Sequence, residues 1–273
     1  MKRKKRRRKD RSRIVRIFLV GMIVLGLAYL IIHGIVNYKR NASIEESIEY
    51  LPRHGYDFSH LKTNGNYSYE DSRFTSSFGI DVSEHQGDID FEKVKAAGVE
   101  FVYIRAGWRG AVTALLNVDK RFEEYYEKAK DAGLKIGFYY FSQATDEREA
   151  VEEADFFVNL IKGKKFDLPL AMDYEDFPEG RIEDLDRQTR TDNAIAFLER
   201  IRMHNYSPIL YTNLNWMRIH YDVEQLLDYD IWFAQYHDLP QYPHPFMIWQ
   251  YSEEGEIPGI EKPVDLNIMF LPK

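Results

Sequence analysis

The sequence predicts an α/β barrel of eight short strands and about five helices, preceded by one transmembrane helix. Two patterns carry this prediction. From residue 78 onward, short apolar runs alternate with amphipathic segments of helical period. Before that point, an apolar run of 20 residues occupies positions 17–36. With 44% hydrophobic and 15% aromatic residues, the 273-residue chain can bury a substantial core.

Charge is distributed very unevenly along the chain. Residues 1–16 hold eleven Lys or Arg and one Asp, whereas the remainder has 26 basic and 43 acidic residues. A body this acidic excludes a broad nucleic-acid-binding surface, because phosphate contacts need cationic side chains. The chain has no Cys, which excludes disulfides, thiolate metal ligands and a cysteine nucleophile.

The apolar run at 17–36 is long enough to cross the hydrocarbon core of a membrane, about 30 Å at 1.5 Å per helical residue. The positive-inside rule then makes residues 1–16 a basic cytoplasmic tail and places everything after the run outside. We therefore expect a single-pass bacterial membrane protein with an uncleaved signal anchor. A cleavable signal peptide is the alternative, but its apolar region would span only about 7–15 residues.

Residues 37–77 are polar and rich in turn-forming residues, so they are predicted to form an extracytoplasmic stalk with one short helix near 44–51. Residues 78–273 form the predicted barrel. Its expected strands are 78–82, 101–106, 135–141, 170–173, 209–212, 231–235, 247–250 and 265–269, and its expected helices are 91–97, 120–132, 147–161, 187–204 and 223–227.

Capping residues support the helix boundaries. Asp90 stands at an N-cap position, and Gly98 and Gly133 follow helices where a C-cap glycine is expected. The helices are concentrated in the first two thirds of the domain, which fits a parallel barrel whose last strands lack helices. An open doubly wound sheet is the alternative.

Four carboxylates mark the expected site. Asp81 ends the first strand, Asp173 and Glu175 lie at and just beyond the end of the fourth, and Asp265 lies on the last. The carboxyl ends of parallel barrel strands converge on one mouth, so these side chains should meet there. Mutual repulsion raises the pKa of at least one carboxyl group in such a cluster, as a general acid at neutral pH requires.

Glycoside hydrolysis uses this chemistry, with one protonated carboxyl group and a second group that stabilises or attacks the sugar centre. Aromatic residues near strand ends offer flat faces for stacking on sugar rings. A metal site that uses the carboxylates and His85 is the alternative, but no second His has a ligand-like spacing. We predict no metal and no cofactor.

Six segments, taken together, resemble the lysozymes of glycoside hydrolase family 25, the Chalaropsis-type muramidases. The resemblance covers residues 78–271. The segments occur in the family's order: 79–91 (GIDVSEHQGDIDF), 135–141 (KIGFYYF), 173–175 (DYE), 231–236 (IWFAQY), 248–252 (IWQYS) and 264–267 (VDLN).

The resemblance implies a modified TIM-like barrel that cleaves the β-1,4 bond between N-acetylmuramic acid and N-acetylglucosamine in peptidoglycan. It makes Glu175 the acid/base, with Asp173, Asp81 and Asp265 completing the catalytic pocket. The predicted membrane anchor adds the expectation of local cell-wall remodelling, or of opening a passage for an envelope-spanning machine. The substrate-binding residues expected with this reading are Tyr139, Tyr211, Trp232, Gln235 and Trp249.

The expected mechanism is substrate-assisted, with the substrate's own N-acetyl group as nucleophile and Asp173 orienting it; a directly nucleophilic Asp is the alternative.

One segment departs from the family. Many members follow the second strand with Lys-Ala-Thr-Glu-Gly, where this chain has RAGWRG at 105–110. Two other functions stay open: a non-catalytic protein that binds wall glycan, and a chitinase-like hydrolase of another β-1,4 glycan.

Overall fold

The computed structural model describes residues 22, 26, 51–63 and 65–273. The chain divides into two units, Met1–Leu51 and Pro52–Lys273. The predicted basic tail and membrane span lie outside the described residues, apart from Met22 and Gly26. Within the described part of the chain, no helix has both the length and the apolar character needed to cross a membrane.

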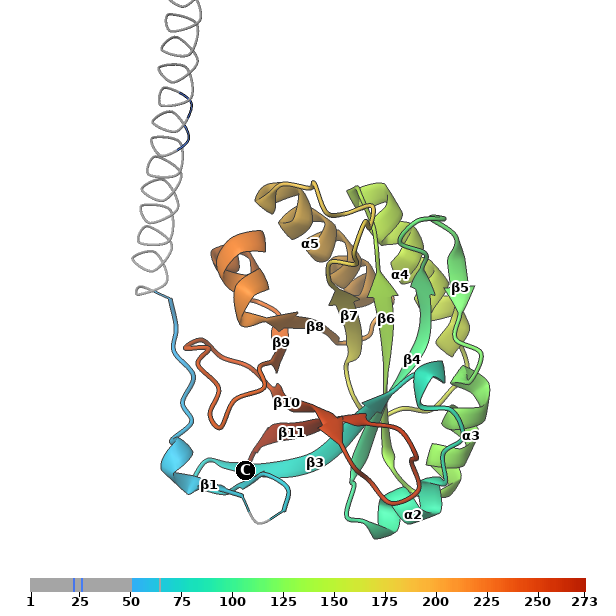
Figure 1. Cartoon of the computed structure of the whole chain (residues 1–273), viewed down its shortest axis with the longest axis vertical. Helices are drawn as coiled ribbons and strands as arrows, with labels where there is room; N and C mark the ends of the chain where they lie inside the picture. Colours follow the sequence, from blue (N-terminus) through green and yellow to red (C-terminus); the bar gives the residue numbers. More distant parts are fainter. Residues whose placement is uncertain (1–21, 23–25, 27–50, 64) are drawn as a thin grey trace, which may run out of the picture. The chain divides into compact units, whose positions relative to one another are not determined.

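The second unit is a closed barrel of eight strands, as the sequence predicts (Figure 1). The sheet closes because β3 pairs with β4 on one side and with β11 on the other, which excludes the open doubly wound sheet. The barrel strands, in chain order, are β3 (Phe74–Val82), β4 (Phe101–Arg109), β6 (Lys135–Ser142), β7 (Leu170–Tyr174), β8 (Pro208–Asn213), β9 (Asp230–Ala234), β10 (Ile248–Gly255) and β11 (Val264–Pro272).

The last strand corrects the prediction of an all-parallel barrel. β11 runs antiparallel to both β10 and β3. The connection between β10 and β11 is only residues 256–263, and a parallel crossover needs a dozen or more residues. The start of β11, not its end, therefore lies at the mouth where the parallel strands finish.

The helices cover the outer faces of β4, β6, β7 and β8, whereas β9 to β11 carry no α-helix (Figure 1). Asp90 caps the first barrel helix as predicted, because its carboxylate accepts a hydrogen bond from the Lys93 backbone N–H. The α-helices of the barrel are α2 (Phe91–Ala96), α3 (Phe122–Asp131), α4 (Glu147–Ile161) and α5 (Arg187–Met203), and the fifth predicted helix is the 3₁₀-helix η4 (Val223–Leu226).

Shorter elements were not predicted. β5 (Leu116–Val118) forms a hairpin with the end of β4, and a π-helix, η3 (Trp216–His220), follows β8. Before the barrel lie η1 (Phe58–His60) and the small hairpin of β1 (Leu61–Lys62) and β2 (Ser68–Tyr69), and η2 (Glu84–Gln86) follows β3.

Aromatic side chains fill the barrel interior. The Trp232 ring lies 4.5 Å from the Tyr103 ring and 5.1 Å from the Tyr211 ring, measured between centroids. Gly137 makes room for this packing, since a Cβ there would lie 2.5 Å from the Tyr103 ring. Gly79 does the same for Phe101, with a 2.4 Å approach. These rings form an apolar floor beneath the mouth.

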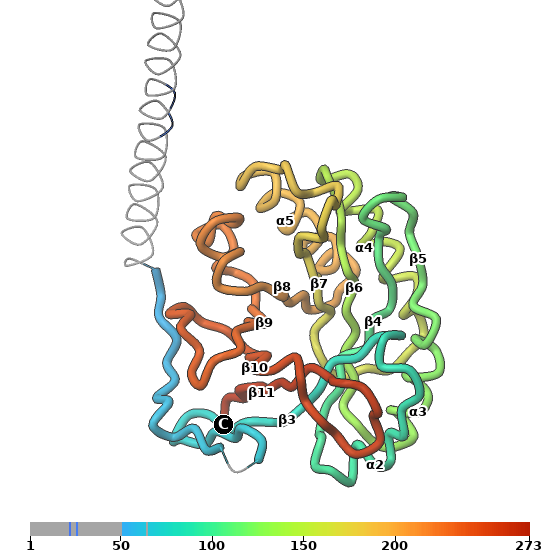
Figure 2. The backbone as a smooth tube through the Cα atoms, viewed as in Figure 1, coloured from blue at the N-terminus to red at the C-terminus, as the bar shows by residue number. Residues whose placement is uncertain are grey.

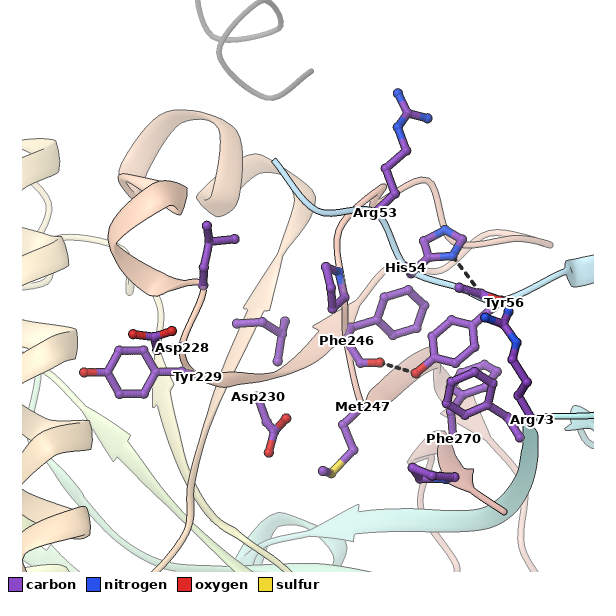
Figure 3. A pocket seen from close by; sticks show the side chains of 16 residues that line it. Arg53, His54, Tyr56, Arg73, Asp228, Tyr229, Asp230, Phe246, Met247 and Phe270 are labelled. Carbon is purple, nitrogen blue, oxygen red and sulfur yellow. Dashed lines mark hydrogen bonds between the residues drawn. The ribbon is translucent and has the colours of Figure 1, made fainter. Parts of the chain in front are cut away.

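The barrel unit begins earlier than the predicted boundary at residue 78. Residues 52–77, expected to belong to the stalk, pack on the barrel, and β3 itself starts at Phe74. Tyr56 stacks on Phe270 with ring centroids 4.2 Å apart, and its hydroxyl donates to the Phe246 carbonyl (2.6 Å; Figure 3). The C-terminus lies beside the same segment (Figure 2), where Lys273 pairs with Glu70. Aromatic residues spaced among turn residues supply these contacts.

We expect Tyr56→Ala to lower the free energy of unfolding of the Pro52–Lys273 unit by about 2 kcal/mol, because the substitution removes a half-buried ring and its hydrogen bond. Urea denaturation measures the change. The exposed Lys62, replaced by Ala, is the control and should shift stability by less than about 0.5 kcal/mol. Equal stabilities of the two variants would contradict the packing role of this segment.

Candidate active site

A pocket of about 210 Å³ opens at the mouth of the barrel, and all four predicted carboxylates line it. Asp81 and Asp265 face each other as register partners of the β3–β11 ladder. Asp173 is the last residue of β7 whose side chain faces the barrel interior, and Glu175 lies one residue beyond that strand. The rest of the lining comprises Tyr139, Tyr211, Trp232, Tyr236 and Gln250. Seven of the nine predicted site residues therefore meet in one pocket.

Asp81 is held as an ion at neutral pH. Its Oδ2 accepts hydrogen bonds from Gln250 Nε2 (2.9 Å) and Asn267 Nδ2 (2.7 Å). Burial raises its pKa to about 6, while these amides and a hydrogen bond from Asp265 oppose the rise. Burial and the adjacent charge of Asp81 raise the pKa of Asp265 to about 9. Asp265 is therefore protonated at neutral pH and donates to Asp81.

The other hydrogen bonds of Gln250 and Asn267 fix which end of each side-chain amide faces Asp81. Gln250 Oε1 accepts from the hydroxyls of Tyr211 and Tyr236, both at 2.9 Å. Asn267 Oδ1 accepts from the indole N–H of Trp232 at 2.8 Å. Each amide therefore turns its NH₂ group toward the carboxylate. Tyr211 and Trp232 thus use their polar atoms inside the protein, and their rings line the pocket.

Glu175 is the carboxyl group whose protonation is poised near neutrality. Burial raises its pKa to about 7, the charges of Asp176 and Asp81 add to the rise, and a hydrogen bond from Asn213 Nδ2 (3.3 Å) opposes it. Burial, followed by the charges of Glu175 and Asp81, raises the pKa of Asp173 well above its usual range. Asp173 Oδ1 is buried and, within the described part of the chain, has no hydrogen-bond partner.

Gln235 and Trp249 do not line this pocket, so their assignment as substrate contacts is corrected. Trp249 is 0% exposed on the outer face of β10, where its indole N–H donates to the Gln235 carbonyl (2.9 Å). The Gln235 side chain bonds to Gln241 in the loop after β9. Ile248 lies in the barrel interior, so strand alternation turns Trp249 outward and Gln250 inward.

The site residues that the sequence reasoning missed are all polar groups that orient the carboxylates. Gln250 lies two positions after the inward Ile248, and Asn267 two positions after Asp265. Asn213 is the last residue of β8. The period of two along each strand is the signal that identifies Gln250 and Asn267.

A larger cavity of about 530 Å³ lies at the opposite end of the barrel, where Asp230 begins β9 and Phe270 lies near the end of β11 (Figure 3). None of the predicted carboxylates lines it.

Among residues 51–63 and 65–273, no group of three or more His, Asp or Glu side chains is arranged to hold a metal ion. His85, weighed as a ligand, is exposed on η2.

Comparison with known proteins places this site in a family. The sequence profile of glycosyl hydrolases family 25 matches residues 80–260. The chain belongs to this family. It is 32% identical over 190 residues to the autolytic lysozyme of Clostridium acetobutylicum, covering 69% of this chain and 54% of that protein. Lysozyme M1 of Streptomyces globisporus is 30% identical over 201 residues, covering 69% of this chain and 66% of that one.

Solved structures agree with the family 25 assignment. The spore cortex lytic enzyme SleM of Clostridium perfringens superposes with a TM-score of 0.64 at 26% identity, covering 71% of this chain and 67% of that one. The bacterial lysozyme of Streptomyces coelicolor gives 0.60 at 28% identity, covering 72% and 92%. The chain thus spans 54% and 66% of the two curated relatives and most of the smaller solved enzyme.

We expect Asp265→Asn to be more stable than the natural protein, by an amount that grows as pH rises. The raised pKa of Asp265 favours folding only while the carboxyl is protonated, so this contribution is lost between its ordinary value of 3.8 and about 9. The upper limit of the difference is about 1.4 kcal/mol per pH unit. Urea denaturation at pH 5, 6.5 and 8 measures it. The exposed Asp184, replaced by Asn, should show no such trend; a pH-independent difference for Asp265→Asn would contradict the prediction.

Proposed function

We propose that this protein is a peptidoglycan hydrolase that cleaves the β-1,4 bond between N-acetylmuramic acid and N-acetylglucosamine. The observation that carries the proposal is Glu175, a carboxyl group with a pKa of about 7 in a pocket that also holds an ionised Asp81. A protonated carboxyl group near neutral pH can donate to a leaving glycosidic oxygen. The lysozymes of family 25 named above supply the substrate class.

The proposed mechanism follows from the positions of two carboxyl groups. Glu175 gives its proton to the glycosidic oxygen as the bond to the anomeric carbon breaks. The carbonyl oxygen of the substrate's N-acetyl group attacks that carbon, while Asp173 Oδ1, which has no partner among the described residues, accepts the acetamido N–H. Glu175 then takes a proton from the water that opens the cyclic intermediate, and this restores the starting state.

Digestion of purified peptidoglycan, followed by identification of the new reducing ends, tests the proposal. Reducing N-acetylmuramic acid supports it. Reducing N-acetylglucosamine, or activity on chitin alone, would favour another glycan hydrolase. Binding without cleavage would favour a wall-glycan binding protein.

Glu175→Gln should retain the fold and lose at least about 10²-fold in activity, because the amide cannot supply the proton. Release of reducing ends from peptidoglycan measures the loss, and a thermal melt checks the fold. Glu179→Gln is the matched control, since Glu179 is exposed in the same loop and does not line the pocket. Turnover by Glu175→Gln within a few-fold of the control would overturn the assignment.

We further propose that residues 17–36 hold the barrel at the outer face of the cytoplasmic membrane, for local remodelling of the wall. The packing of residues 52–77 leaves only 37–51 as the link, which spans at most about 50 Å. An enzyme on this tether acts on the wall layer nearest the membrane and is a weak lysin from outside.

Protease added to intact protoplasts should therefore digest the barrel but spare the basic tail, because the barrel lies outside. Immunoblots against tags at each terminus follow the two parts. A cytoplasmic enzyme probed in the same sample reports on leakage. A protected barrel, or a mature protein free in the medium that lacks residues 17–36, would contradict the anchor.

A further inference from the structure

Glu175 stands where the backbone pairing of the barrel has just ended. β6 and β7 pair up to Ser142 and Tyr174, and Glu175 is the next residue on β7's side. Gln143 is the next residue on β6's side and is 0% exposed. Its Nε2 donates to the Glu175 carbonyl oxygen at 2.7 Å. The side-chain amide thus continues the pairing by one residue and fixes the main chain of Glu175.

Gln143 is itself held at both of its backbone groups. Its N–H donates to Glu153 Oε1 (3.2 Å), and its carbonyl accepts from Arg181 Nη1 (3.3 Å). Glu153 is 0% exposed and also accepts from Arg109 Nε at 2.6 Å and from the Ser142 hydroxyl. None of these residues lines the pocket at the mouth.

The charged side chains around Gln143 form a cluster. It connects the loops that follow β4, β6 and β7, which contain Ala114, Gln143 and Arg181. Arg109, which is 4% exposed, also donates to the Ala114 carbonyl (3.0 Å) and the Glu152 carboxylate (2.7 Å). Arg181 binds both carboxylate oxygens of Glu149, each at 2.9 Å.

The side chain of Glu175 is held from the other neighbour strand. Asn213, the last residue of β8, donates from Nδ2 to Glu175 Oε1 (3.3 Å) and accepts from the Trp216 backbone N–H (3.0 Å) at Oδ1. The main chain and the carboxyl group of Glu175 are therefore fixed separately, by one amide each.

We propose that Gln143 is a positioning residue for the general acid Glu175, and that the cluster of Arg109, Glu149, Glu153 and Arg181 acts on catalysis through it. The inference rests on the proposed function. Gln143 touches no substrate; it sets the place from which Glu175 donates its proton. A displaced general acid loses rate steeply, because proton transfer needs hydrogen-bond distance in the transition state.

Gln143→Met keeps the volume and removes the N–H donor. The expected result on soluble peptidoglycan fragments is a fall in kcat of roughly 10-fold or more, with KM changed by less than about 2-fold. Ile161→Val, a buried change on α4 outside these contacts, controls for lost stability and should keep kcat. Wild-type kcat in Gln143→Met, or a proportionate loss in both variants, would overturn the inference.

Gln143→Glu gives a second readout and decides the matter if Gln143→Met does not fold. A protonated Glu at this position can donate to the Glu175 carbonyl, whereas an ionised one repels it. The activity of Gln143→Glu relative to wild type should therefore rise as pH falls from 8 to 5. A constant ratio would overturn the inference. The proposed function fails separately, if the wild-type protein releases no reducing ends.

Discussion

The contact between Asp81 and Asp265 is the constraint on which the rest of the site depends. The two residues face each other across the ladder that closes the barrel, and they share one proton at neutral pH. The contact exists because β11 runs antiparallel, which brings its start to the mouth. Gln250 and Asn267 then aim their amides at the charge that stays on Asp81. The β3–β11 ladder that closes the barrel is therefore also the one that brings Asp81 and Asp265 together.

Burial, more than any single neighbour, sets the protonation of the pocket. It is the largest influence on the pKa of all four carboxyl groups. Four aromatic residues, Tyr139, Tyr211, Trp232 and Tyr236, line the same pocket as the carboxyl groups. The apolar floor beneath the mouth needs Gly79 and Gly137, where a side chain would overlap Phe101 or Tyr103.

The sequence predicted the strands, the helices and the four carboxylates because their signals are local. Apolar period, caps such as Asp90 and strand-end position need only a few residues of context. The positions of the misassigned residues depend on contacts with residues that are distant in the sequence. Ala234 of β9 and Ile248 of β10 belong to the barrel core, so their neighbours Gln235 and Trp249 face away from the interior. The direction of β11 follows from a short connection, and the packing of Tyr56 follows from partners about 190 residues away.

Residues 105–110, where the sequence differs from the motif of many family members, contain two arginines with different surroundings. Arg105 faces the mouth, where its charge opposes the raised pKa of Asp173, and it is held by Asp119 (2.8 Å). Arg109 points the other way, into the buried ions behind Gln143. Gly107 lets the β5 hairpin close, because a Cβ there would lie 2.3 Å from the Asn117 carbonyl oxygen. The hairpin supplies the Ala114 carbonyl that Arg109 needs. Residues 105–110 therefore contribute one charge that acts on Asp173 and one arginine to the buried cluster behind Gln143.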